Sequence, residues 1–492
     1  MRVRLVAVLL PMFSWTLSAQ TVGASLSGTV HDPSGAVIPR ADIEITNTGT
    51  AATRVLKTDE QGRYRDPALV PGDYELRVSA PGFQTLVRRG IQLTVGQDGI
   101  VDVTLEVGRT AGEVTVTAEI ARINLASGAL SGLVDQKQMR DLPLNGRSFQ
   151  QLALLQPGVG AALAAGNDVV GGRTPKISIN GARPEQSSFL LDGSDINNVY
   201  NKTPGSVAGV LLGVEAVLEF QVLTNAYSAE FGRSAGGIIN AVTRSGTNRY
   251  HGSLFEFVRN SAFDAKNFFD PASAPIPPFK RNQFGGALGG PIRRDRTFFF
   301  GTFESLIERL GVTGVAAVPD LNARRGVLPS GPVELHPLIP RYLDTLFPLP
   351  NGRVLGGGVA EYLFSRSQPT NEYFTQGRID HRFSSKDTLF GRYTFDTGNV
   401  DRQLFNKPPI VFTKERSRNQ YVTLEEQHTF TPALLNALRL SYSRSTQEAD
   451  NQRTISIPPE LSWIPGGSSV TSRFRDWLPR WPATSGCLGT II

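Results

Sequence analysis

The feature that most constrains this fold is a two-residue alternation of side chains in the carboxyl-terminal half of the chain. Polar or charged side chains occupy every second position of one segment: Gln376, Arg378, Asp380 and Arg382. Apolar or aromatic side chains lie mostly between them, and the next segment alternates in the same way: Leu389, Gly391, Tyr393 and Phe395. Because side chains point to alternate sides of a β-strand, each segment predicts a strand with one polar and one apolar face.

The spacing of such segments favours a membrane-spanning barrel over a soluble sandwich, which has the same alternation. Seven candidate strands fall between residues 247 and 446: 249–259, 282–292, 297–308, 372–383, 388–398, 417–430 and 434–446. Their connections are alternately long and short, as expected for a barrel with short periplasmic turns, and the longest predicted loop is 309–371. We therefore predict the first part of a transmembrane antiparallel β-barrel, with Phe298–Phe300 and Phe303 in an interfacial aromatic girdle.

The amino end of the chain predicts export. Residues 1–19 contain Arg2 and Arg4, a short apolar stretch and the small residue Ala19 before Gln20. This pattern is typical of a secretory signal peptide and is too short to span a bilayer. The net charge of +6 over 492 residues, without a dense basic run, argues against a nucleic-acid partner.

Residues 24–108 consist of short β-prone segments separated by turn residues, which predicts a small β-sandwich. The region resembles the carboxypeptidase regulatory-like family, which has a prealbumin-like or Ig-like fold and is sometimes classed with carbohydrate-binding folds. That family has no peptidase chemistry, and no histidine here begins a zinc motif, so we predict no metal and no cofactor. The resemblance depends on Gly28, Val30, Asp32, Gly35, Ala36, Ile38, Pro39, Ala41, Thr58, Asp59, Gly62, Tyr64, Pro71, Gly72, Tyr74, Pro81, Gly82 and Phe83.

The segment between residues 142 and 246 resembles the plug domain of TonB-dependent outer-membrane receptors. It is most similar to the Oar-like subgroup, whose members carry a sandwich of this kind before the plug. The resemblance implies an α+β plug over residues 121–246 that fills a barrel beginning at residue 247. The motif residues, in the family's order, are Leu142, Pro143, Asn145, Gly146, Arg147, Asn180, Gly181, Arg183, Asp192, Gly193, Gly232, Gly236 and Gly237.

Residues 109–120 link the sandwich to the plug and include a short β-prone stretch: Glu113, Val114, Thr115, Val116, Thr117 and Ala118. Such a strand can add to the exposed edge of a partner sheet. From the residues alone, a last sandwich strand or a plain linker is the alternative. In the family that the plug resembles, a segment at this place is the TonB box, which contacts a TonB-type energy-transducing partner of the inner membrane.

Ser234 lies in a formal match to the G-x-S-x-G turn of α/β-hydrolases, Gly232 to Gly236. That turn requires a helix after the serine, whereas residues 238–243 are strand-like. We therefore predict no catalytic residue and interpret these glycines as positions of tight turns or close backbone approach. Asp192 and Asp195 are interpreted as turn aspartates that bond their own backbone, not as paired catalytic acids.

Together these patterns predict a mainly β protein of the Gram-negative outer membrane. The family resemblance implies energised uptake of a nutrient too large for porins, and the sandwich suggests a carbohydrate-derived ligand, although no motif indicates the residues that contact it. The alternative is a secreted or surface glycan-binding adhesion module without transport. Plugged transporters have about 22 strands, and residues 447–492 are irregular, so we expect a truncated or frame-shifted member of the family.

Overall fold

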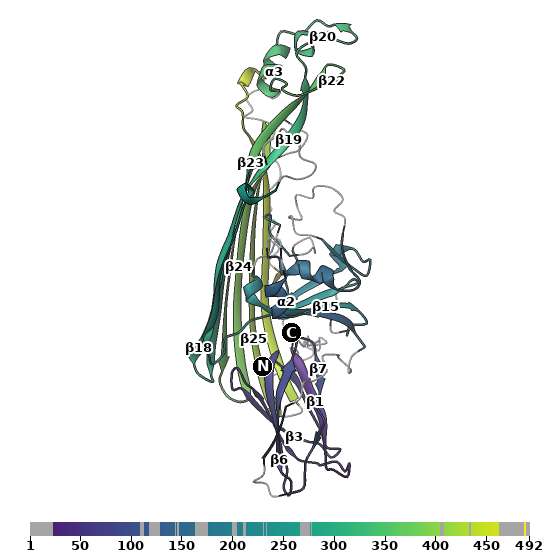
Figure 1. Ribbon diagram of the computed structural model, residues 1–492, viewed down its shortest axis with the longest axis vertical. Coiled ribbons are helices and arrows are strands. Elements are labelled where there is room, and N and C mark those ends of the chain that lie inside the picture. The colour runs from purple at the N-terminus through teal and green to yellow at the C-terminus, as the bar shows by residue number, and fades with distance from the viewer. Residues whose placement is uncertain are drawn as a thin grey trace, which may run out of the picture.

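Three β-rich bodies follow one another along the computed structural model (Figure 1). The structure describes residues 23–108, 113–117, 128–142, 144, 147–162, 176–198, 204–209, 213–229, 231–232, 234–265, 276, 278–403, 408–431, 434–461 and 487–488. The predicted signal peptide therefore lies outside the described residues, as does most of the predicted linker and of the irregular end. Among the described residues, no helix is long and apolar enough to cross a membrane.

The amino-terminal body is a sandwich of two sheets with an apolar core. One sheet contains β4 (Arg63–Leu69), β1 (Ala24–His31), β7 (Asp98–Ile100) and β8 (Val103–Thr104). The other has the order β3 (Thr53–Lys57), β2 (Asp42–Asn47), β5 (Gly72–Ser79), β6 (Thr85–Leu93) and β9 (Glu113–Thr117). Leu26, Ile43 and Leu76 are fully buried between the sheets. Gly28 permits close approach between β1 and the segment that joins β7 to β8 in the same sheet, because a Cβ there would lie 1.9 Å from the Val101 carbonyl oxygen.

The second body is the α+β plug, built on a mixed sheet with the order β10 (Leu130–Val134), β15 (Val217–Asn225), β16 (Ile238–Thr243), β13 (Ser188–Leu191) and β14 (Ser194–Asp195). Asp135 begins α2 (Gln136–Asp141) with a capping box to Gln138. The plug core contains Phe189 and Phe220 together with Tyr421 from the third body. The smaller elements are η2 (Phe149–Leu155), β11 (Val159–Ala161), β12 (Ile177–Ile179), η4 (Pro184–Gln186) and η5 (Val214–Ala216).

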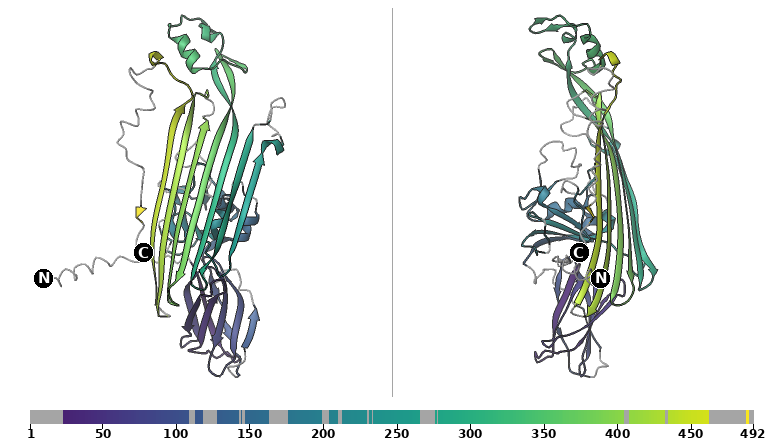
Figure 2. Two further views of the ribbon diagram at one scale, coloured as in Figure 1. Left: turned by 90° about the vertical axis from the view of Figure 1, so that its left-hand side faces the viewer. Right: turned by 180° about the vertical axis from the view of Figure 1, so that it is seen from behind.

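The third body is a curved antiparallel sheet with a strand at each of the seven predicted places (Figure 2). These strands are β17 (His251–Asn260), β18 (Phe279–Arg293), β19 (Thr297–Pro319), β23 (Val359–Arg382), β24 (Asp387–Gln403), β25 (Val411–Thr431) and β26 (Leu434–Arg453). The short elements around them are η6 (Ser261–Phe263), η7 (Ala323–Arg325), β20 (Val327–Leu328), β21 (Gly331–Pro332), α3 (Ile339–Leu346), β22 (Val354–Gly356), η8 (Pro459–Leu461) and β27 (Cys487–Leu488).

The plug packs against one face of this sheet, which we call the inner face (Figures 1 and 2). Gln376 and Arg378 point to the inner face and are 2% and 5% exposed, whereas Tyr373 and Ile379 on the outer face are 41% and 53% exposed. The predicted alternation is therefore confirmed. On β23, the polar positions at residues 376 and 378 meet the plug, and the apolar positions are left for lipid.

Three expectations about this sheet were wrong. Residues 309–371 are not one loop, because β19 and β23 stay paired from Thr297↔His381 to Pro319↔Val359 and leave only 320–358 as the connection. The three consecutive phenylalanines do not form one girdle, because the pleat sends Phe298 and Phe300 to the inner face and Phe299 to the outer face. β26 likewise continues past the predicted end at residue 446.

Replacing Gly237 by alanine should loosen the plug sheet, since a Cβ there would lie 2.4 Å from the Ile179 side chain. We expect a loss of about 1–3 kcal/mol, the usual cost of overpacking, seen as faster hydrogen exchange of residues 238–243. Gly160→Ala is the control, because a Cβ at Gly160 would meet nothing within 4 Å. Equal exchange in the two variants would contradict this account of Gly237.

Candidate functional site: contacts between plug and wall

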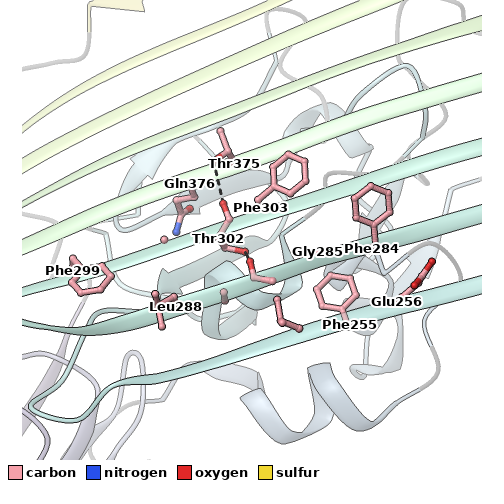
Figure 3. Close-up of a pocket in the computed structure, with 14 residues that line it drawn as sticks. Phe255, Glu256, Phe284, Gly285, Leu288, Phe299, Thr302, Phe303, Thr375 and Gln376 are labelled. Atoms are coloured by element: carbon pink, nitrogen blue, oxygen red, sulfur yellow. Dashed lines mark hydrogen bonds between the residues drawn. The ribbon is translucent and has the colours of Figure 1, made fainter.

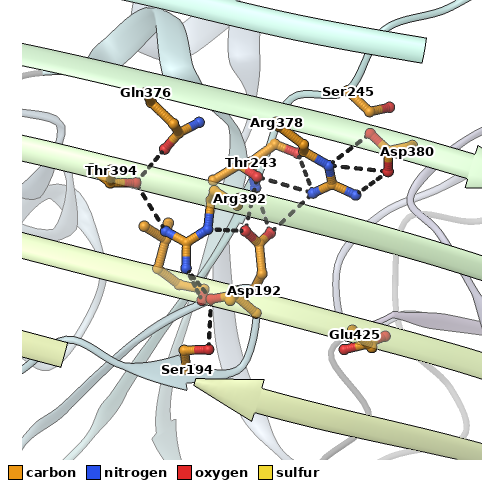
Figure 4. A network of polar contacts seen from close by, with 12 residues as sticks. Asp192, Ser194, Thr243, Ser245, Gln376, Arg378, Asp380, Arg392, Thr394 and Glu425 are labelled. Atoms are coloured by element: carbon orange, nitrogen blue, oxygen red, sulfur yellow. Dashed lines mark hydrogen bonds and ion pairs between the residues drawn. The ribbon is translucent and has the colours of Figure 1, made fainter. Parts of the chain in front are cut away.

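A buried network around Asp192 joins the plug to the inner face (Figure 4). Asp192 and Gly193 form the turn between β13 and β14 with φ angles of 48° and 71°, the left-handed conformation typical of a tight hairpin turn. This turn places the Asp192 carboxylate against the curved sheet, which we call the wall. There Oδ2 lies 2.9 Å from Arg392 Nε, and Oδ1 lies 3.4 Å from Arg378 Nη1. Asp192 also accepts hydrogen bonds from the backbone N–H and the hydroxyl of Thr243 on β16, at 2.9 and 2.8 Å.

The two arginines of this network are themselves buried. Asp380 provides Arg378 with a second carboxylate, 2.7 Å from Nη2. For Arg392, which is fully buried, Asp192 is the only carboxylate within ion-pair distance among the described residues. A buried charge that loses its partner costs far more than a surface ion pair contributes. Asp192 is therefore the residue on which the charge balance of this contact depends.

A second network of ion pairs lies near β17, the first strand of the curved sheet. Arg147 of the plug lies 3.0 Å from Glu215 and 3.2 Å from Glu304 of β19. Arg244 pairs with the other oxygen of Glu215 at 3.2 Å, and Ser253 of β17 donates to that same oxygen. Two plug arginines thus neutralise one plug carboxylate and one wall carboxylate, which links three segments distant in sequence.

The structure divides the predicted plug residues into two groups. Arg147 and Asp192 contact the wall, whereas Asn180, Gly181 and Arg183 build turns within the plug. Asn180 and Gly181 adopt φ angles of 51° and 75°, Asn180 Nδ2 donates to the Thr224 carbonyl, and Arg183 precedes η4. A Cβ added at Gly236 or Gly237 would lie 3.1 or 2.4 Å from the nearest side-chain atom, whereas one at Gly232 would meet nothing within 4 Å. Leu142 ends α2. Pro143, Asn145 and Gly146 lie outside the described residues.

The interpretation of the two turn aspartates was half right. Asp195 accepts a bond from the nearby Asn197 N–H, as expected, but Asp192 faces the wall arginines. Ser234 donates its hydroxyl to the carbonyls of Gln186 and Gly237 and is followed by strand β16, so the hydrolase turn is not formed. The sequence reasoning missed Arg392 and Glu304 as plug contacts. Both are charged residues at inner-face positions of an alternating strand, and this pattern in the sequence could have indicated them.

The predicted TonB-box strand, β9, lies in the sandwich as its last strand, which was one of the two alternatives to a TonB box. β9 pairs in parallel with β6 over five residues, from Thr85↔Glu113 to Arg89↔Thr117. It forms the last strand of its sandwich sheet, and Thr115 is exposed. Ala118 lies outside the described residues. A strand at the end of a sheet keeps one edge open for a further strand, so this placement and a partner-binding role are compatible.

The sandwich contacts both other bodies beside the short turns of the sheet. Glu219 of β15, which is 7% exposed, accepts a hydrogen bond from the backbone N–H of Val95. Arg54 of β3 contacts Thr429 near the end of β25, and Arg382 of β23 donates to the Ala51 carbonyl. Burial raises the pKa of Glu219 to about 7, although the Val95 N–H opposes this shift.

A hollow of roughly 1200 Å³ lies over β18 and β19 but not at the plug contact (Figure 3). Its walls include outer-face side chains of Phe284, Leu288, Phe299 and Phe303. Gly301, on the same face, adds no side chain to its floor. The hollow is apolar and faces away from the plug, so it does not belong to the plug contacts.

One group of side chains has the composition of a metal site. Asp387, Glu426 and His428 bring one ligand atom each within 4.8 Å of one another at the short-turn end of β24 and β25. His428 Nδ1 already contacts the Asp387 carboxylate, and Ser384 donates to its other oxygen. A hydrogen-bonded acid–histidine pair therefore explains most of this cluster without a metal.

Three family models match the chain in the order of its three bodies. A carboxypeptidase regulatory-like domain matches residues 25–106, a TonB-dependent receptor plug domain matches 126–238, and an outer membrane beta barrel domain matches 242–485. The chain is also 32% identical to the TonB-dependent transporter Oar of Myxococcus xanthus over 298 residues, 57% of this chain and 26% of that protein. The chain belongs to the TonB-dependent outer-membrane receptors. The predicted family and membrane location are thereby confirmed.

Other TonB-dependent receptors match more distantly. A probable TonB-dependent siderophore receptor, PirA of Acinetobacter baumannii, is 27% identical over 33% of this chain and 21% of its own length. A solved structure of the ferric enterobactin receptor of Pseudomonas aeruginosa is 16% identical, covers 64% of this chain and 41% of that one, and has a TM-score of 0.39. The chain spans about a quarter of the length of the curated relatives it matches.

Asp192→Asn should destabilise this receptor by about 3–5 kcal/mol, because it leaves the Arg392 guanidinium buried without a carboxylate. The free energy of unfolding in denaturant measures the loss. Adding Arg392→Met should recover part of it. Glu60→Gln, which breaks the exposed Arg40–Glu60 pair, is the control and should change little. A loss no larger than the control's would contradict a supporting role for Asp192.

The raised pKa of Glu219 predicts a pH dependence with a definite sign. The folded protein holds this proton up to about pH 7, whereas the unfolded chain releases it near its ordinary value of 4.5. The free energy of unfolding should therefore fall as the pH rises from about 4.5 to about 7 and then level off. Glu219→Gln should remove this part of the pH dependence, and Glu106→Gln, at an exposed site, should not. Equal pH profiles for wild type and Glu219→Gln would refute the assignment.

Proposed function

We propose that this chain takes part in energised uptake across the outer membrane, with the plug as its movable element. The observation that carries the proposal is the polar contact between plug and wall. Asp192, Arg378 and Arg392 meet there as buried ion pairs, and only three of the described buried wall side chains join the apolar clusters of the plug: Leu306, Phe374 and Tyr421. Entering water can replace the partner of a buried charge, so such a contact can open without unfolding the wall.

We further propose that β9 receives a TonB-type partner of the inner membrane. Two features support this role: the strand lies between sandwich and plug, and it has one open edge in its sheet. A partner strand would add to that edge, or would replace β6 as the neighbour of β9, through backbone hydrogen bonds.

The proposed functional units of the chain are 24–108, 109–120, 121–246 and 247–446, after a signal peptide at 1–19.

The ligand is proposed as a nutrient too large for porins that enters from the end with the long connections. Two relatives are named as siderophore receptors, the probable receptor PirA and the ferrienterobactin receptor of Escherichia coli, which is 27% identical over 37% of this chain and 24% of its own length. These names favour an iron-chelate ligand over the carbohydrate suggested by the sandwich. An adhesion module is the weaker alternative, because it gives no reason for buried ion pairs between plug and wall.

Thr115→Pro tests the role of β9. Proline removes one backbone donor from the strand and should weaken binding of the TonB carboxyl-terminal domain to the full chain at least ten-fold. Thr115→Ala keeps that donor and is the matched control. Calorimetric titration in detergent measures both affinities. Undiminished binding by Thr115→Pro would rule β9 out as the contact strand.

A further inference from the structure

The inner face of the sheet follows a regular rule of charge pairing. Most carboxylates at the plug contact and along the inner face have an arginine within 3.4 Å. Glu219 is one exception, and it accepts the Val95 N–H instead. The pairs are Glu215 with Arg147 and Arg244, Glu304 with Arg147, Glu308 with Arg281, Asp192 with Arg378 and Arg392, Asp380 with Arg378, Glu415 with Arg402, and Glu425 with Arg439. An exception to this rule therefore calls for a physical explanation.

Glu372 and Asp396 are such an exception. Both are fully buried, and neither has a lysine, arginine or histidine within ion-pair distance among the described residues. Glu372 lies opposite Gly398, and Asp396 lies opposite Phe374, so the two acids are diagonal neighbours on the inner face. Their carboxyl groups interact directly across β23 and β24. Among the residues that the structure describes, neither oxygen of Glu372 nor Oδ2 of Asp396 has a partner that meets the distance and angle limits of a hydrogen bond.

The plug covers this acid pair with further oxygen atoms. Ser206 is fully buried and lies beside Glu372. The Gly205 carbonyl accepts a hydrogen bond from Asn419 Nδ2 at 3.2 Å, and the same nitrogen donates to Asp396 Oδ1 at 3.0 Å. The carbonyl keeps a second lone pair. Carboxylate, hydroxyl and carbonyl oxygens from β23, β24 and the plug thus lie around the Asn419 amide and the Glu372 side chain.

We propose that Glu372 and Asp396, with Ser206 and Gly205 of the plug, form a binding site for Ca²⁺. Two adjacent carboxylates cannot both stay ionised in a buried site without a neutralising charge. A single shared proton would still leave one negative charge on these carboxylate oxygens, with no lysine, arginine or histidine of the described residues within ion-pair distance. A hard cation that takes six to eight oxygen ligands at 2.3–2.6 Å can coordinate all of them, with water completing the shell.

The site would join the plug to the wall at a place where none of the described arginines does so. Its ligands come from two wall strands and from the plug segment 204–207, which also bonds to the wall through Val207 N and Ser417 Oγ at 3.1 Å. Calcium should therefore hold this plug segment against β23 and β24. This inference does not depend on the identity of the transported ligand or on β9.

Calorimetric titration of CaCl₂ into the chelator-treated full chain in detergent at pH 7 tests the site. We expect one Ca²⁺ per chain, with affinity at least ten-fold lower in the double variant Glu372→Gln, Asp396→Asn. The control, Asp387→Asn with Glu426→Gln, removes the other acidic cluster and should bind as the wild type does. Binding that is absent, or that only the control variant loses, would overturn the proposal.

A second measurement needs no variant. Hydrogen exchange of residues 204–209 in the wild-type chain should slow at least several-fold when Ca²⁺ replaces the chelator, since the cation would bind this plug segment. Exchange of the sandwich strand β5 serves as the internal reference and should not change. Equal exchange of residues 204–209 with and without Ca²⁺ would refute the proposed contact, even if the double variant failed to fold.

Discussion

The pleat of the long strands is the constraint on which this structure depends. A strand that presents Tyr373 and Ile379 to lipid must present Gln376 and Arg378 to the other side, because successive side chains alternate. The inner face therefore carries many polar and charged side chains, and the plug that covers part of it supplies partners for several of them. Asp192 and Arg147 supply two of the matching charges from tight turns whose φ angles are positive. The turns of the plug thus place its charges opposite charged side chains of the wall.

A continuous series of contacts runs through the three bodies. β9 pairs with β6, the loop after β6 contacts Glu219 on β15, and β15 pairs with β16. β16 carries Thr243, which bonds Asp192 at the wall. A displacement of β9 would therefore be passed to the plug through the hydrogen bond between Val95 and Glu219, and from there to the ion pairs of Asp192. Since transmission needs an element with two arrangements, the polar contact around Asp192 is the natural candidate for it.

Much of the fold could be predicted from the sequence, because period-two patterns and turn residues are local signals. All seven strand positions and the three bodies were recognisable in this way. The extension of β19 and β23 beyond the predicted ends was not, since Val312 and Ala316 gain their burial only from pairing with a distant strand. The partners of Asp192 were hidden for the same reason. Nothing local shows that a turn aspartate will meet an arginine 186 residues further along the chain.

The most direct test of the central claim is the environment of single side chains along β23. Spin labels would be placed one at a time at Tyr373, Gln376 and Ile379, with Cys487 replaced, in chain reconstituted into bilayers. We predict that labels at Tyr373 and Ile379 are relaxed by oxygen dissolved in lipid, whereas the label at Gln376 is shielded by the plug. Equal access of oxygen at all three positions, or relaxation only by a water-soluble agent, would contradict a sheet with lipid outside and the plug inside.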